Sequence, residues 1–248
     1  MKTKKTSVNQ ITEGVIWKQL LFFFFPIMLG TLFQQLYNTA DAVVVGRFVG
    51  TQALAAVGGS TGQMVNLIVG FFVGLSSGAT VIIARYYGAK NKKELNDTLH
   101  TAAALSIVGS IIITIAGIAL TPFMLKLMNT PKDVIQGSST YLRIYFAGII
   151  FVFIYNVGSA ILRAVGDSKR PLYFLIVCCF INIFLDVLLV VGFNMGVAGA
   201  ALATVISQAV SAVLVIYALM NSKDMYCLKP KEIHFHKFLF LSIVTIGL

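Results

Sequence analysis

Six apolar runs, each long enough to cross a lipid bilayer as a helix, constrain the fold of this chain more than any other feature. A helix needs about 20 residues to span the hydrocarbon core. The runs cover residues 17–45, 54–84, 98–123, 134–162, 171–193 and 197–220. Only 11% of the residues are charged, against about 25% in a soluble domain. The sequence therefore predicts an all-α membrane protein built on six transmembrane helices.

The predicted spans divide the chain into three regions. Residues 1–222 form a six-helix transmembrane lobe, residues 223–236 a basic cytoplasmic linker, and residues 237–248 the start of a seventh transmembrane helix. Twelve residues are too few to cross a bilayer, so we expect the sequence to be truncated. His234 and His236 lie in the linker without acidic partners and are interpreted as surface residues.

The basic residues predict the orientation of the spans. Fifteen of the 19 Lys and Arg residues fall on the side that holds the N-terminal tail, the loops near residues 85–93 and 163–170, and the linker. Only Arg47, Lys126 and Lys132 fall on the other side. Because basic loops stay in the cytoplasm, we expect a multi-pass protein of the bacterial inner (cell) membrane with a cytoplasmic N-terminus. The net charge of +10 is spread over these short loops, which favours the lipid bilayer, and not nucleic acid, as the partner.

Two acidic residues lie inside the apolar runs. Asp41 and Asp186 are the only ones of the nine Asp and Glu residues within predicted spans. A carboxylate at that depth costs several kcal/mol unless it is neutralised or partnered, so such residues commonly serve as proton relays or cation ligands. Asp186 follows Pro171 by 15 residues, which is about 22 Å along a helix. Both acids are therefore expected in the outer half of the membrane.

Neutral polar side chains accompany the two acids. Asn182 lies one turn before Asp186, on the same helix face. A polar stripe on the first span has i, i+3, i+4, i+7 spacing and contains Gln34, Tyr37, Asn38 and Asp41. Thr204, Tyr141 and Asn156 could close a shared pocket. The alternative is that these polar groups only hold helices together, as intramembrane Asn and Thr often do.

Proline and glycine suggest further features of the spans. Pro26 predicts a kink in the first span because it lacks an amide hydrogen. The second span carries glycines at i, i+4 intervals, which predict a face for close helix packing; they are Gly58, Gly62, Gly70, Gly74 and Gly78. No zinc-protease helix, phosphate loop or nucleophile elbow occurs in the sequence. We therefore predict neither an enzyme nor a bound cofactor.

Several of these segments resemble the multidrug and toxic compound extrusion (MATE) family. Pro26 is followed by Gly30, and Tyr37-Asn38-Thr39-Ala40-Asp41 leads into Gly46 and Gly50. The resemblance continues with Arg85-Tyr86-Tyr87-Gly88-Ala89, with Arg163-Ala164-Val165-Gly166-Asp167, and with Asn182 and Asp186. The order and spacing of these segments carry the resemblance across all six spans.

The resemblance implies twelve helices in two six-helix lobes, with this chain similar to the N-terminal lobe. It implies antiport in which H⁺ or Na⁺ drives the export of drugs and other small organic, often cationic, compounds. Asp41 and Asp186, with Tyr37, Asn182 and Thr204, would form the proton or cation site. Na⁺ would bind at Asp41, Asn182, Asp186 and Thr204. Gln34, Asn38, Tyr141 and Asn156 would line the substrate cavity, and Pro26 would allow the first helix to bend.

Two alternatives stay open. Lipid-linked oligosaccharide flippases share this superfamily, but they are expected to carry more basic residues in the cavity. The missing C-terminal lobe is a required partner for transport, so a half-transporter that does not transport is the second alternative.

Overall fold

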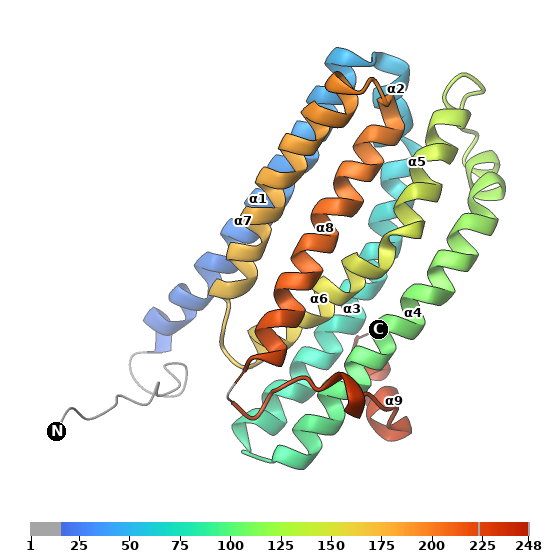
Figure 1. Cartoon of the computed structure of the whole chain (residues 1–248). Coiled ribbons are helices and arrows are strands. Elements are labelled where there is room, and N and C mark those ends of the chain that lie inside the picture. Colours follow the sequence, from blue (N-terminus) through green and yellow to red (C-terminus); the bar gives the residue numbers. More distant parts are fainter. Residues whose placement is uncertain (1–15, 223, 248) are drawn as a thin grey trace.

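The computed structural model describes residues 16–222 and 224–247, and these residues fold into helices without a strand (Figure 1). Five helical stretches are long and apolar enough to cross a bilayer: 20–48 within α1, α2 with α3, α4, α7 with η1, and α8. A bent pair, α5 with α6, makes a sixth. The six predicted spans are confirmed. Lys2, Lys4, Lys5 and Lys223, which contributed to the predicted orientation, lie outside the described residues.

The bounds of the elements follow the apolar runs closely. They are α1 Ile16–Phe48, α2 Thr51–Gly58, α3 Ser60–Gly88, α4 Lys92–Leu127, α5 Ile135–Ala147, α6 Ile149–Ala164, α7 Lys169–Asp186, the π-helix η1 Val187–Gly192, α8 Gly196–Met220, the 3₁₀ turn η2 Pro230–Glu232 and α9 Lys237–Gly247.

Successive spans run up and down in one bundle (Figure 1). α7 packs between α1 and α8, and α6 packs against α3, α4 and α8. One end of the bundle carries the connections at 88–92, 164–169 and 220–237, and we call it the basic end because most of the Lys and Arg residues lie there. The opposite end carries the connections at 48–51, 127–135 and 192–196.

The fourth span is broken, which the sequence analysis missed. α5 and α6 meet at an angle of 51° on either side of Gly148. A Cβ atom at Gly148 would overlap the side chain of Val205 on α8. Glycine therefore lets the bend lie directly against α8. By contrast, α1 continues through Pro26 as one helix, and bending at Pro26 stays a prediction.

The predicted glycine face is correct at two positions and wrong at two others. A Cβ at Gly74 would lie 2.7 Å from the carbonyl oxygen of Gly247 on α9, and Gly78 also packs against α9. Gly58 and Gly70 have no neighbour within 4 Å of such a Cβ. The span breaks at Gly59, which separates Gly58 from the register of Gly74 and Gly78, whereas Gly70 keeps this register but contacts no neighbour.

The segment 163–167 acts as a turn that positions α7. Gly166 has a φ of 92° and stands just after the end of α6, a conformation that favours glycine. Asp167 Oδ1 accepts a hydrogen bond of 3.1 Å from the Arg170 amide, and its carboxylate pairs with the Arg170 side chain at 3.1 Å. An acid at a helix N-terminus satisfies free amides and interacts favourably with the helix dipole. The motif therefore sets where α7 begins, and with it the depth of Asp186.

Candidate functional site

Two helices that are far apart in sequence bring the two membrane acids together. Asp41 on α1 is 4% exposed and Asp186 on α7 is 0% exposed. The Asp41 carboxylate lies close enough to Asp186 and Asn182 for their side chains to interact. Thr204 on α8 donates its hydroxyl to Asp41 Oδ2 at 3.2 Å. Three helices thus contribute to one compact polar cluster, which we call the acid cluster: Asp41, Asn182, Asp186 and Thr204.

Most polar atoms of the acid cluster have no hydrogen-bond partner among the described residues. These buried atoms are Asp41 Oδ1, both carboxylate oxygens of Asp186, and the side-chain oxygen and nitrogen of Asn182. Buried polar groups are normally paired, because an unpaired one costs about 1–3 kcal/mol. Two facing carboxylates can only accept hydrogen bonds. Such a set of oxygens suits a species that donates to, or coordinates, several of them at once.

A single proton or a monovalent cation meets this requirement. Asp41, Asp186, Asn182 and Thr204 supply carboxylate, amide and hydroxyl oxygens, which are hard ligands suited to a hard cation. The described residues contain no group of three or more His, Cys, Asp and Glu side chains placed to hold a metal ion. The donor set fits Na⁺ or a shared proton better than a transition metal, which prefers nitrogen or sulfur ligands.

A wide helical turn begins directly after Asp186. Residues Val187–Gly192 form the π-helix η1, and π-helical turns are rare and often occur at functional sites. The turn brings the Leu189 backbone against α8 at Gly199, where a Cβ would lie 3.1 Å from the Leu189 carbonyl carbon. This contact joins the end of α7 to the start of α8, one turn before Thr204. The run Val187–Gly192 did not predict the π-helix, because it is apolar throughout and shows no periodicity that distinguishes a π turn from an α turn.

A cavity of about 170 Å³ lies beside the acid cluster. Its walls include four of the predicted cavity residues: Gln34, Asn38, Tyr141 and Asn156. Tyr37 and Thr204 also line it, whereas Asp41, Asn182 and Asp186 do not. Thr204 therefore belongs to both sites, because it faces the cavity and donates to Asp41. Pro26 lies in the same wall.

The sequence analysis missed several cavity residues, among them Gln208 and Tyr145. Gln208 donates from Nε2 to the Tyr37 hydroxyl at 3.3 Å, and both side chains are 6% exposed. Gln208 lies one helical turn after Thr204, so the i, i+4 spacing used for Asn182 and Asp186 could have identified it. Tyr145 lies one turn after Tyr141 and stacks on it, with ring centroids 6.2 Å apart. Both residues extend stripes that the analysis had already recognised.

Arg163 also lines the cavity. The sequence analysis placed Arg163 in a loop, but it lies in the last turn of α6, at the basic end. The one tyrosine and three amides predicted for the cavity, together with Tyr37, Tyr145, Tyr155 and Gln208, give the walls a mainly neutral, aromatic character.

The fold defines a lobe of a multi-pass membrane protein with two acids buried between its helices. The model of the MatE family matches residues 26–188. This chain belongs to the MatE family. The match covers the stretch that contains Pro26, Tyr37, Asp41, Asn182 and Asp186.

Relatives of known name agree with this assignment. The chain is 35% identical over 207 residues to the probable multidrug resistance protein YoeA of Bacillus subtilis (strain 168), covering 82% of this chain and 44% of YoeA. It is 31% identical to the probable multidrug resistance protein NorM of Thermotoga maritima, covering 84% of this chain and 46% of NorM. The chain therefore spans about half the length of the curated relatives that it matches.

A solved structure shows the same arrangement of helices. An outward-facing conformation of a multidrug resistance MATE family transporter of the MOP superfamily superimposes with a TM-score of 0.89 at 28% sequence identity. The superposition covers 98% of this chain and 54% of that transporter. The prediction of a six-helix MATE-type lobe is confirmed.

Proposed function

We propose that this chain is the N-terminal lobe of an antiporter that exports small organic compounds, and that H⁺ or Na⁺ binding at the acid cluster drives the export. The observation that carries the proposal is the set of unpartnered oxygens on Asp41 and Asp186. Their desolvation is costly unless an ion or a proton joins them. A site of this kind binds and releases its ligand as its access to water changes, which is what an alternating-access carrier requires.

Thr204 connects the ion site to the substrate cavity in this proposal. Its hydroxyl has a single proton, and it lies 3.2 Å from Asp41 Oδ2 and 3.1 Å from the carbonyl oxygen of Ala200. One hydroxyl proton cannot fully serve two acceptors. Coordination of a cation by the same hydroxyl oxygen would therefore change the contact that α8 makes with α1. Since Thr204 also forms part of the cavity wall, ion binding and substrate binding would influence each other.

The cavity suits part of an organic molecule. Pockets that enclose drug-sized ligands have volumes of about 300–1,000 Å³, which is larger than the 170 Å³ of this cavity. A substrate would therefore lie between this lobe and a second one. Tyrosine rings attract organic cations through cation–π interactions of about 0.5–2 kcal/mol, which supports neutral or cationic substrates.

The flippase alternative receives less support. It expects several basic residues in the cavity, whereas Arg163 is the one Lys or Arg among the lining residues that the structure describes. The acids beside the cavity favour cations over a phosphorylated lipid. For the orientation, we propose that the basic end faces the cytoplasm of a bacterium, with the N-terminus on that side.

The test is efflux of a fluorescent organic cation from right-side-out vesicles that contain the complete transporter. An imposed H⁺ gradient without Na⁺, or a Na⁺ gradient at fixed pH, is expected to drive transport. If neither gradient drives efflux, the antiport proposal is wrong. The same assay with the 248-residue chain alone tests the half-transporter alternative, since no transport is expected from a single lobe.

A further inference from the structure

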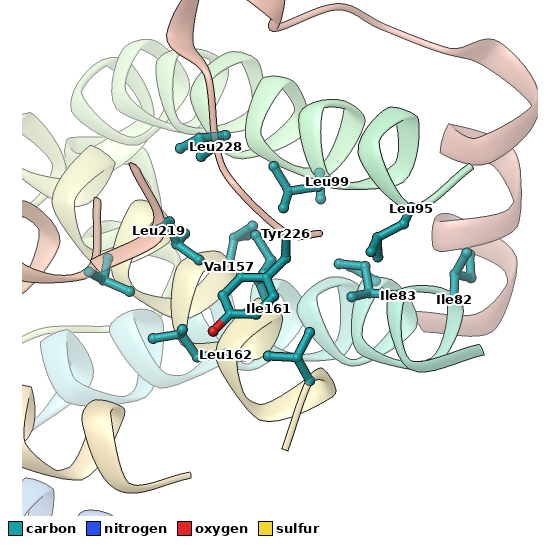
Figure 2. Close-up of a cluster of buried hydrophobic side chains, with 14 of the residues drawn as sticks. Ile82, Ile83, Leu95, Leu99, Val157, Ile161, Leu162, Leu219, Tyr226 and Leu228 are labelled. Carbon is teal, nitrogen blue, oxygen red and sulfur yellow. The ribbon is translucent and has the colours of Figure 1, made fainter. Parts of the chain in front are cut away.

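The segment that joins α8 to α9 is packed into the lobe. We call residues 224–236 the strap. Tyr226 and Leu228 are each 8% exposed and belong to an apolar cluster at the basic end (Figure 2). Their neighbours in this cluster include Leu99 on α4, Ile161 on α6 and Leu219 on α8. A flexible linker would leave such side chains in water, so the apolar anchors indicate a docked segment.

The backbone of the strap is also held. The Leu228 amide donates to the carbonyl oxygen of Leu219 at 3.1 Å, which folds the strap back over the end of α8. The Tyr87 hydroxyl donates to Asp224 Oδ2 at 3.2 Å, and the Tyr87 ring meets that of Tyr226 edge to face. The first half of the strap is therefore fixed to α3 as well as to α8.

His100 provides a buried polar anchor in the middle of the strap. The His100 ring is 0% exposed on α4. Its Nδ1 lies 2.8 Å from the carbonyl oxygen of Asn96, which can only accept, so Nδ1 carries the proton. Nε2 is then free to accept the amide of Lys229 at 3.2 Å. One imidazole thus satisfies a carbonyl of its own helix and an amide of the strap.

The last part of the strap makes two further contacts with α4. The His236 amide donates to the Thr101 hydroxyl oxygen at 3.2 Å. The His234 ring stacks on His100 at 6.0 Å, and its Nε2 lies 3.4 Å from Asp97 Oδ1. Both histidines are exposed, as expected for surface residues, but the expectation that they lack acidic partners is wrong for His234. Sequence alone could not place Asp97 beside His234, because 137 positions separate them.

Both ends of the strap continue into packed helices. α8 precedes it, and α9 follows it and packs against α3 at Gly74 and Gly78. We propose that the strap stays docked on α3, α4 and α8 while the lobe works, so that the strap moves with these helices and is not a hinge. This inference goes beyond the proposed function, because the docking does not depend on what the lobe transports.

The first test locks the strap to α4. Thr101→Cys and His236→Cys place two thiols where the Thr101 side chain already contacts the His236 backbone. The native thiols are removed first by replacing Cys178, Cys179 and Cys227 with Ala. We expect an oxidant to form the disulfide readily in the complete transporter. Efflux should stay within about twofold of that of the reduced protein, because a contact present in both conformations favours neither.

Two outcomes would overturn the proposal. The first is failure of the disulfide to form, which would mean that the strap is not docked as described. The second is a loss of efflux of about tenfold or more that a reducing agent restores, which would mean that the strap must undock during transport. The single variant Thr101→Cys is the control for oxidation elsewhere. If the reduced protein exports nothing, the antiport proposal is wrong. The yield of the disulfide still tests whether the strap is docked on α4.

The second test uses trypsin on the 248-residue chain in detergent. Cleavage after Lys231 requires the strap to open, whereas Lys229 precedes Pro230 and resists trypsin. In His100→Gln the side-chain oxygen can still reach the Lys229 amide, whereas in His100→Asn the shorter side chain serves only the Asn96 carbonyl. We expect His100→Asn to be cut several-fold faster than His100→Gln. Tyr226→Ala, which removes an apolar anchor, should also be cut faster. Equal rates for the wild type and all three variants would show that the strap is already free.

Discussion

The acid cluster in the membrane and the polar cluster at the basic end both contain buried polar atoms. These atoms are hydrogen-bonded at the basic end, whereas most of those in the acid cluster are not. At the basic end, His100 uses both ring nitrogens and Thr101 accepts the His236 amide. In the acid cluster, five side-chain atoms of Asp41, Asn182 and Asp186 have no partner among the described residues. Structures tolerate unpaired buried groups mainly where function needs them. The polar cluster at the basic end therefore holds the fold together, whereas the unpaired atoms of the acid cluster support its proposed role as an ion or proton site.

The largest effect is expected from removing the acids. Asp41→Asn and Asp186→Asn should each lower efflux by the complete transporter by more than about tenfold, because an amide cannot carry the charge that binds the ion. Their Tm values in detergent should not fall, since an amide donor can pair with the remaining carboxylate. Asp97→Asn is the matched control at the basic end and should leave efflux nearly unchanged. Full efflux by Asp41→Asn and by Asp186→Asn would mean that the acid cluster only holds helices together.

The opposite pattern is expected at the basic end. Tyr226→Ala should lower the free energy of unfolding by about 2–4 kcal/mol, because it removes a buried ring from the apolar cluster. Tyr217→Ala is the matched control, because Tyr217 is 68% exposed on α8 and should cost little in detergent. Thermal unfolding measured by intrinsic fluorescence compares the two. Equal losses of stability would mean that Tyr226 is not part of the core.

The spans and the two membrane acids could be predicted because each is visible in a short stretch of sequence. For each, the alternative structure is strongly unfavourable. An apolar run cannot be dissolved in water, and an acid in such a run is conspicuous. The pairing of Asp41 with Asp186 was expected from their depth, since the bilayer supplies a common reference plane. Asn182 followed from helical spacing, whereas Thr204 was expected at the site from the family resemblance.

The features that the sequence did not predict depend on contacts between helices. The bend at Gly148 reflects its closeness to Val205 on α8, and the π turn after Asp186 reflects the contact between Leu189 and Gly199. The docking of the strap depends on the fit of Tyr226 and Leu228 among α4, α6 and α8. None of these leaves a periodic signal in the chain, because each is set by the shape of a distant partner.

A smaller effect should follow from a change beside the acid cluster. Gln208→Leu removes the hydrogen bond to the Tyr37 hydroxyl and is expected to lower efflux several-fold, which corresponds to about 1 kcal/mol. Tyr37→Phe should have a similar effect, and the double variant should be no worse than either single one, since the two residues share one bond. Ser207→Ala is the control, because the Ser207 hydroxyl donates only within its own helix. Additive losses in the double variant would contradict a shared role.

The smallest effect concerns the ion pair on the surface of the strap. Lys229 Nζ lies 2.9 Å from Glu232 Oε1, and this hydrogen bond lowers the pKa of Glu232 below its ordinary value of 4.5. A carboxyl group whose pKa is lowered by folding stabilises the protein above its unfolded pKa, and this contribution is lost as the pH falls through the folded value. Because both groups are exposed and screened by solvent, Glu232→Gln should lower Tm only slightly at pH 7 and not at all in acid. Thermal scans between pH 3 and pH 7, with Lys231→Gln as the control, would measure this. A higher Tm for Glu232→Gln than for the wild type at pH 7 would mean that folding raises this pKa, and that the acid at position 232 opposes docking of the strap.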